Sequence, residues 1–88
     1  MQNAAQFYSE LDEMFANHAG ADAIESYLLR KLAEARAAAE TSAANEEANP
    51  LQLSILNELM GFYRSRGEHA KNQSIIERAL NLADSMHL

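Results

Sequence analysis

The sequence is short of the residues that build strands, disulfide bonds and tight loops. Its 88 residues include no cysteine, no tryptophan and no valine, with only three glycines and one proline. Without cysteine, disulfide bonds and thiolate metal ligands are excluded, and without alternating β-branched runs there is no signal for strands. Alanine, leucine, glutamate, glutamine and arginine, which favour helix, are abundant. The composition predicts an all-α protein, and the length predicts a single domain.

Long apolar runs are also missing. No stretch of the chain approaches the roughly 20 apolar residues that a membrane span needs. The first residues lack the basic and then apolar layout of a secretory signal. We therefore expect a cytoplasmic protein with no membrane partner.

Positive charge is scarce in the first half of the chain. Residues 1–50 hold nine acidic and three basic side chains, whereas residues 51–88 hold four of each. The net charge of −6 therefore comes from the first half. A negative field of this kind repels nucleic acid and anionic lipid, so we expect no nucleic-acid partner.

Motifs for catalysis, metals or cofactors are absent from the sequence. His18, His69 and His87 lie far apart and show no spacing typical of a metal site. Glu10 and Glu13 lie one helical turn apart, but no further ligand accompanies them. There is no glycine-rich phosphate loop and no nucleophile motif. We expect a protein that is not an enzyme and that needs no cofactor.

Apolar residues recur at helical spacing in four segments. The pattern predicts one hairpin over residues 4–40, a linker at 41–49 and a second hairpin over 50–86. Gly20 is expected to take the left-handed conformation at the end of the first helix. Asn49 and Pro50 are expected to start the third helix, as cap and first residue. Because that helix is apolar almost all round, we expect it to be the central one.

The two predicted hairpins match when they are offset by 48 residues. Large apolar residues then coincide at eight positions: Phe7 with Ile55, Tyr8 with Leu56, Leu11 with Leu59, Met14 with Phe62, Phe15 with Tyr63, Tyr27 with Ile75, Leu28 with Ile76 and Leu32 with Leu80. A repeated helical hairpin is the elementary unit of an α-solenoid.

Residues 55–84 resemble a tetratricopeptide repeat, and residues 7–40 resemble it weakly. The residues that fit the family pattern are Leu59, Tyr63, Gly67, Ile76, Ala79 and Leu80. Met60 and Asn72 depart from it, since the family places small residues there. The resemblance implies two stacked hairpins, a fragment of a right-handed α-solenoid, across a single domain at 1–88. It also implies a protein–protein interaction module that works as a scaffold.

In this family the first helix of each hairpin lines a groove that holds extended peptides. The resemblance therefore implies a peptide groove formed by outward residues of the first and third helices: Gln6, Ser9, Glu13, Ser54, Asn57 and Arg64. The expected partner is a protein or peptide, bound through burial of apolar side chains.

The fourth helix has an apolar side with no neighbour after it in sequence. Leu80, Leu82 and Met86 lie there and are a candidate flank for self-association, or for packing of further repeats. The alternative to the interaction module is a compact four-helix bundle whose role is oligomerisation or structural support. The two differ in packing, because hairpins stack side by side in the first and close around one core in the second.

Overall fold

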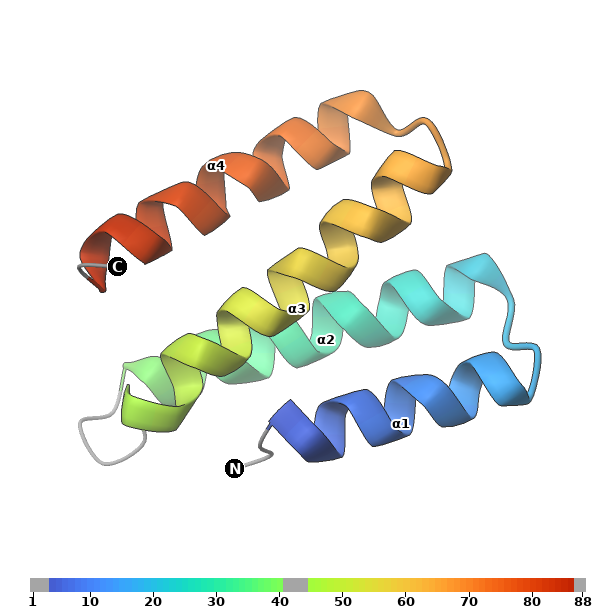
Figure 1. The fold of residues 1–88 in the computed structure, drawn as a ribbon, viewed down its shortest axis with the longest axis horizontal. Coiled ribbons are helices and arrows are strands. Elements are labelled where there is room, and N and C mark those ends of the chain that lie inside the picture. Colours follow the sequence, from blue (N-terminus) through green and yellow to red (C-terminus); the bar gives the residue numbers. More distant parts are fainter. Residues whose placement is uncertain (1–3, 41–44, 87–88) are drawn as a thin grey trace.

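The computed structural model describes residues 4–40 and 45–86, and in these residues it contains helices and no strand (Figure 1). The helices are, in chain order, α1 (Ala4–Ala16), α2 (Ala21–Ala39), α3 (Asn45–Ser65) and α4 (His69–Ser85). The all-α prediction is confirmed. None of the described helices is both long and apolar enough to cross a membrane.

α3 is the helix against which the others pack. It lies close to α2 on one side and to α4 on the other, and it also contacts α1. In Figure 1, α1 and α4 lie at opposite edges of the molecule with α2 and α3 between them. The prediction of a central third helix is confirmed.

The core forms around the middle of α3. Its most buried large side chains come from three helices: Phe7, Leu28, Leu32, Ile55, Leu56 and Leu59. Ala35 of α2 is also buried and belongs to the same core. Most of the apolar face that periodicity assigns to each helix packs inward, with Phe15 and Leu80 as exposed exceptions.

α3 begins five residues earlier than predicted. The helix starts at Asn45, so Pro50 lies inside it rather than at its first position. The missing N–H of Pro50 removes one helical hydrogen bond. Residues 45–49 include two glutamates and an alanine, which favour a helix N-terminus and extend the helix across the proline. Residues 41–44 of the predicted linker lie outside the described residues.

The two hairpin turns use the same backbone motif with different residues. Gly67 has φ 71°, and Glu68 N–H donates to Tyr63 C=O at 2.9 Å. In the first turn His18 has φ 56°, and Ala19 N–H donates to Met14 C=O at 2.9 Å. Both are helix endings closed by a left-handed residue.

The prediction that Gly20 takes the left-handed conformation is wrong. Gly20 has φ −68° and is the N-cap of α2. The hydrogen bond from Ala19 to Met14 places the left-handed residue directly before Ala19, at His18. Histidine is one of the side chains that tolerate this conformation.

Asn72 of α4 occupies a position where the family pattern has a small residue. Its Oδ1 atom is buried and has no hydrogen-bond partner among the described residues. A buried amide oxygen is stable only when it accepts a hydrogen bond. The carbonyl oxygen has none here, so it lowers the stability of the fold.

The packing around α3 predicts that truncating its middle weakens the whole domain. Leu59 is fully buried, so Leu59→Ala should lower the free energy of unfolding by about 2–5 kcal/mol. Leu80→Ala is the matched control, because Leu80 is 65% exposed and should change stability by about 0.5 kcal/mol or less. Denaturant titration followed by circular dichroism measures both. Equal losses for the two variants would contradict the central position of α3.

Candidate functional site

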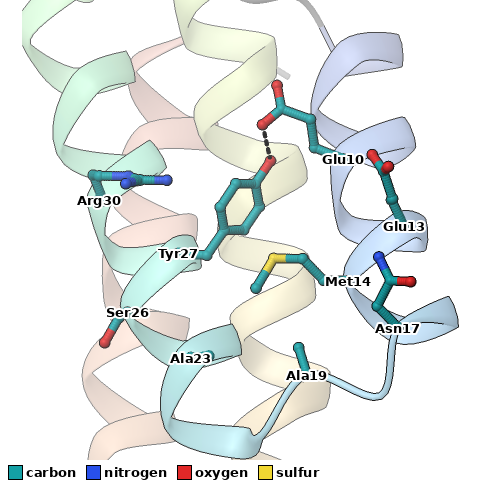
Figure 2. Close-up of a pocket in the computed structure, with 9 residues that line it drawn as sticks. All are labelled: Glu10, Glu13, Met14, Asn17, Ala19, Ala23, Ser26, Tyr27 and Arg30. Carbon is teal, nitrogen blue, oxygen red and sulfur yellow. Dashed lines mark hydrogen bonds between the residues drawn. The ribbon is translucent and has the colours of Figure 1, made fainter.

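α1 and α2 enclose a groove of about 550 Å³ that is open to solvent (Figure 2). One wall is polar, with Glu10 and Glu13 of α1 and Asn17 directly after that helix, and the opposite wall carries Ser26 and Arg30 of α2. The ring of Tyr27 and the side chains of Met14, Ala19 and Ala23 complete the lining. The groove therefore combines an apolar floor with charged walls, as binding sites commonly do.

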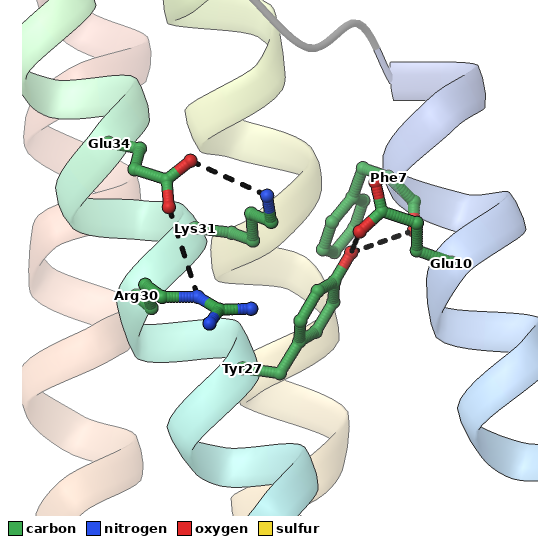
Figure 3. A network of polar contacts seen from close by, with 6 residues as sticks. All are labelled: Phe7, Glu10, Tyr27, Arg30, Lys31 and Glu34. Atoms are coloured by element: carbon green, nitrogen blue, oxygen red, sulfur yellow. Dashed lines mark hydrogen bonds and ion pairs between the residues drawn. The ribbon is translucent and has the colours of Figure 1, made fainter.

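Tyr27 connects the two walls of this groove (Figure 3). Its hydroxyl donates to Glu10 Oε2 at 3.1 Å and lies 3.4 Å from the carbonyl oxygen of Phe7. The Tyr27 ring stacks on Phe7 with centroids 6.0 Å apart. Arg30 and Lys31 each place a cationic group 5.7 Å from the centre of the Tyr27 ring, and both form ion pairs with Glu34.

A second tyrosine–glutamate pair joins the hairpins. The hydroxyl of Tyr63 in α3 donates to Glu25 Oε2 of α2 at 2.8 Å, and Lys71 Nζ of α4 lies 3.2 Å from the same oxygen. Lys71 Nζ also lies 5.7 Å from the centre of the Tyr63 ring. The Tyr63 and Lys71 hydrogen bonds hold the pKa of Glu25 below its usual value. Burial and the bond to Glu25 raise the pKa of Tyr63 to about 12.

A hollow lies between α1, α2 and α3; its smaller part is mainly apolar, whereas its larger part is also lined by His18 and Arg66. Phe15, Ile24, Phe62 and Ser65 line both of its adjoining parts, which measure about 230 and 470 Å³. Phe15 is 53% exposed there, although it is a large aromatic residue. Its counterpart in the second hairpin, Tyr63, is buried, so the environment of Phe15 is specific to the first hairpin.

The two hairpins also differ in side-chain exposure at the outer side of α4. Leu80 is 65% exposed, whereas its counterpart Leu32 in α2 is 2% exposed. α3 packs closely against α2 and belongs to the same core as Leu32. Leu82 and Met86, predicted to share a flank with Leu80, are half-buried, and Leu82 packs against the core. Residues two apart on a helix face different directions, so Leu80 is the exposed one of the three.

The six residues predicted for a peptide groove lie on the surfaces of α1 and α3. Gln6, Ser9, Asn57 and Arg64 are exposed, and Ser54 is half-buried. Glu13 is exposed and lies in the wall of the α1–α2 groove. The hollow beside α1 is lined instead by other residues of α3: Glu58, Gly61, Phe62 and Ser65.

Sequence reasoning missed the two tyrosine–glutamate pairs. Glu10 lies 17 residues from Tyr27, and Glu25 lies 38 residues from Tyr63. The spacing of residues within one helix does not predict contacts between residues so far apart in the sequence. A tyrosine on an apolar stripe facing a glutamate on another helix was the available clue, because a buried tyrosine hydroxyl needs a hydrogen-bond partner.

Neither the side chains of the described residues nor comparison with known proteins assigns a metal or a family. In the described ranges 4–40 and 45–86, no three histidine, aspartate or glutamate side chains gather where they could hold a metal ion. The chain matches no known family model, no curated protein and no solved structure. What the molecule does must therefore be inferred from its surfaces.

The lowered pKa of Glu25 predicts a pH-dependent contribution to stability. A carboxyl whose pKa is lowered on folding stabilises the fold above its unfolded pKa, and this contribution is lost as the pH falls through the folded value. Glu25→Gln should therefore reduce the loss of stability on acidification between neutral pH and the folded pKa of Glu25. Denaturant unfolding at a series of pH values measures it.

Tyr63→Phe is the companion variant, since it keeps the ring and removes the donor to Glu25. It should lower the free energy of unfolding at neutral pH by about 1 kcal/mol and raise the pKa of Glu25. Glu77→Gln, at an exposed acid of α4, is the control and should leave the pH profile as in the parent. Parallel profiles for parent and Glu25→Gln would contradict the role given to this pair.

Proposed function

We propose that the protein is a non-enzymatic interaction module that binds a peptide or a partner helix on its helical surface. The observation that carries this proposal is the exposure of the Phe15 side chain. A phenylalanine that is 53% exposed beside an apolar hollow costs free energy in water, and covering it with a partner regains that free energy. Aromatic side chains of this kind are enriched at the centres of protein interfaces.

The arrangement of the helices supports an open stack of hairpins like that of tetratricopeptide repeats. α1 and α4 lie at opposite edges in Figure 1, and α3 lies between α2 and α4. The Cα atoms span 36 × 26 × 18 Å, a flattened shape that suits side-by-side helices. In such a stack the hollow beside Phe15 lies between the first helices of the two hairpins.

Selection from a displayed library of random peptides tests the proposal. The peptides that the protein enriches should carry apolar side chains. They should bind Phe15→Ser at least tenfold more weakly, because a central interface aromatic contributes about 2 kcal/mol or more. Leu29→Ser is the matched control, since Leu29 of α2 is 41% exposed and lies outside the lining of the hollow. Binding is measured by fluorescence anisotropy with labelled peptides.

Two results would contradict the role of Phe15. One is the absence of any enriched peptide after selection. The other is equal binding of the enriched peptides by the parent and by Phe15→Ser, when circular dichroism shows that both proteins are folded.

A second candidate function is oligomerisation through α4. It is favoured by Leu80, which is 65% exposed although the corresponding Leu32 is 2% exposed in the interior. The second half of the chain, which includes α4, has no net charge, so two copies meeting there avoid the repulsion between their acidic halves.

Light scattering tests this second function. The parent should show a mass above that of the monomer that rises with concentration, and Leu80→Glu should be monomeric. Leu29→Glu, which adds the same charge on α2, should behave as the parent does. A monomeric parent across the measurable concentration range would exclude self-association through α4.

A further inference from the structure

We propose that the α1–α2 groove is a binding site for the basic side chain, lysine or arginine, of a peptide partner. This inference rests on the proposed function, because it assumes that the protein binds peptides. It adds a second contact, on a different side of α1 from the hollow beside Phe15, and it assigns a chemistry to that contact. The groove is the one shown in Figure 2.

The groove is open because Tyr27 separates the helices that form it. Its ring projects from α2 toward α1, where the hydroxyl reaches the Phe7 carbonyl and Glu10 (Figure 3). Phe7 stacks on the ring. Toward the turn the residues that line the groove include Ala19 and Ala23, whose side chains are too short to fill it. In α4 the position that corresponds to Tyr27 is occupied by the smaller Ile75. α4 packs closely on α3.

The charges around the groove favour a cation. The carboxylates of Glu10 and Glu13 stand on its α1 wall. α1 carries no basic side chain at all, and Arg30 is the first one in the sequence. A groove with low-dielectric walls concentrates the negative potential of the acidic half of the chain. A basic side chain is therefore drawn toward the α1 wall.

The contact between the two hairpins shows how this protein holds an ammonium group. Lys71 Nζ lies 3.2 Å from a Glu25 oxygen and 5.7 Å from the centre of the Tyr63 ring, while the Tyr63 hydroxyl donates to the same oxygen. The α1–α2 groove presents the same two groups, a tyrosine ring and the glutamate that accepts its hydroxyl. A lysine from a partner would find at Glu10 a carboxylate beside a tyrosine ring, as Lys71 does at Glu25. The two places differ at the ring, because Arg30 and Lys31 already lie 5.7 Å from the centre of the Tyr27 ring, so the added ammonium group pairs with the carboxylates of the α1 wall.

The remaining groups of the groove suit the rest of a peptide rather than a bare cation. The methylene groups of a lysine or arginine can pack on Met14 and on the two alanines of the floor. Arg30 on the opposite wall carries guanidinium donors that can bond a peptide carbonyl oxygen. The groove thus offers a place for the charged end, the apolar stem and the main chain of one basic residue.

Titration of the ¹⁵N-labelled protein with two small probes tests the proposal by NMR. The probes are N-acetyl-lysine methylamide and its uncharged analogue N-acetyl-norleucine methylamide. The lysine probe should shift the backbone amide signals of Asn17, Ala19 and Ala23. The norleucine probe should bind more weakly, by about fivefold, which corresponds to one exposed ion pair.

Charge reversal separates contact from long-range attraction. Glu13→Lys should weaken binding of the lysine probe by about tenfold, because it removes an attraction and adds a repulsion. Asp12→Lys is the matched control. It makes the same change at the neighbouring exposed position of α1, outside the groove lining, and should weaken binding less than twofold in salt that screens distant charges.

Three results would overturn the inference. These are equal binding of the two probes, equal effects of Glu13→Lys and Asp12→Lys, and the absence of any shift at the groove amides. The proposed function survives these results if selected peptides still lose binding with Phe15→Ser. Conversely, the lysine probe could shift the groove amide signals while Phe15→Ser leaves peptide binding unchanged. That result would support the groove site and exclude the hollow as a peptide-binding site.

Discussion

The fold depends on burying a broad apolar face of α3. The buried side chains of α3 lie on one broad face of the helix: Leu51, Ile55, Leu56, Leu59 and Tyr63. The partly buried Leu53 and Met60 extend this face further around the helix. α2 and α4 cover this broad apolar surface from opposite sides. An isolated hairpin of this chain would leave part of this surface exposed, so the helices stabilise one another as a set.

The two hairpins share a pattern but differ in how tightly they close. Tyr27 stands between α1 and α2, whereas Ile75 occupies the corresponding place between α3 and α4. Repeat symmetry also breaks at Phe15 and Leu80, which are exposed while Tyr63 and Leu32 are buried. These differences produce the groove, the hollow and the outer face of α4. The surfaces available to a partner thus arise where the second hairpin does not repeat the first.

Polar contacts between helices follow one theme in this protein. A tyrosine hydroxyl donates to a glutamate on another helix twice, within the first hairpin at Tyr27 and Glu10 and between the hairpins at Tyr63 and Glu25. Each contact satisfies a phenol on a helix face that is otherwise apolar. Each also places a carboxylate beside an aromatic ring, where a cation is stabilised by both groups. In the second pair Lys71 is that cation.

The sequence by itself determined the all-α class, the central position of residues 50–65 and most of the core, because helical periodicity assigns an inward face to each segment. It could not determine the start of α3 at Asn45, the left-handed conformation of His18, or which leucines of α4 stay exposed. Those features were decided by the tertiary structure. So were the Tyr27–Glu10 and Tyr63–Glu25 hydrogen bonds, whose partners lie 17 and 38 positions apart in the sequence. The physical reason is that contacts between helices depend on their spacing and crossing, which no local pattern encodes.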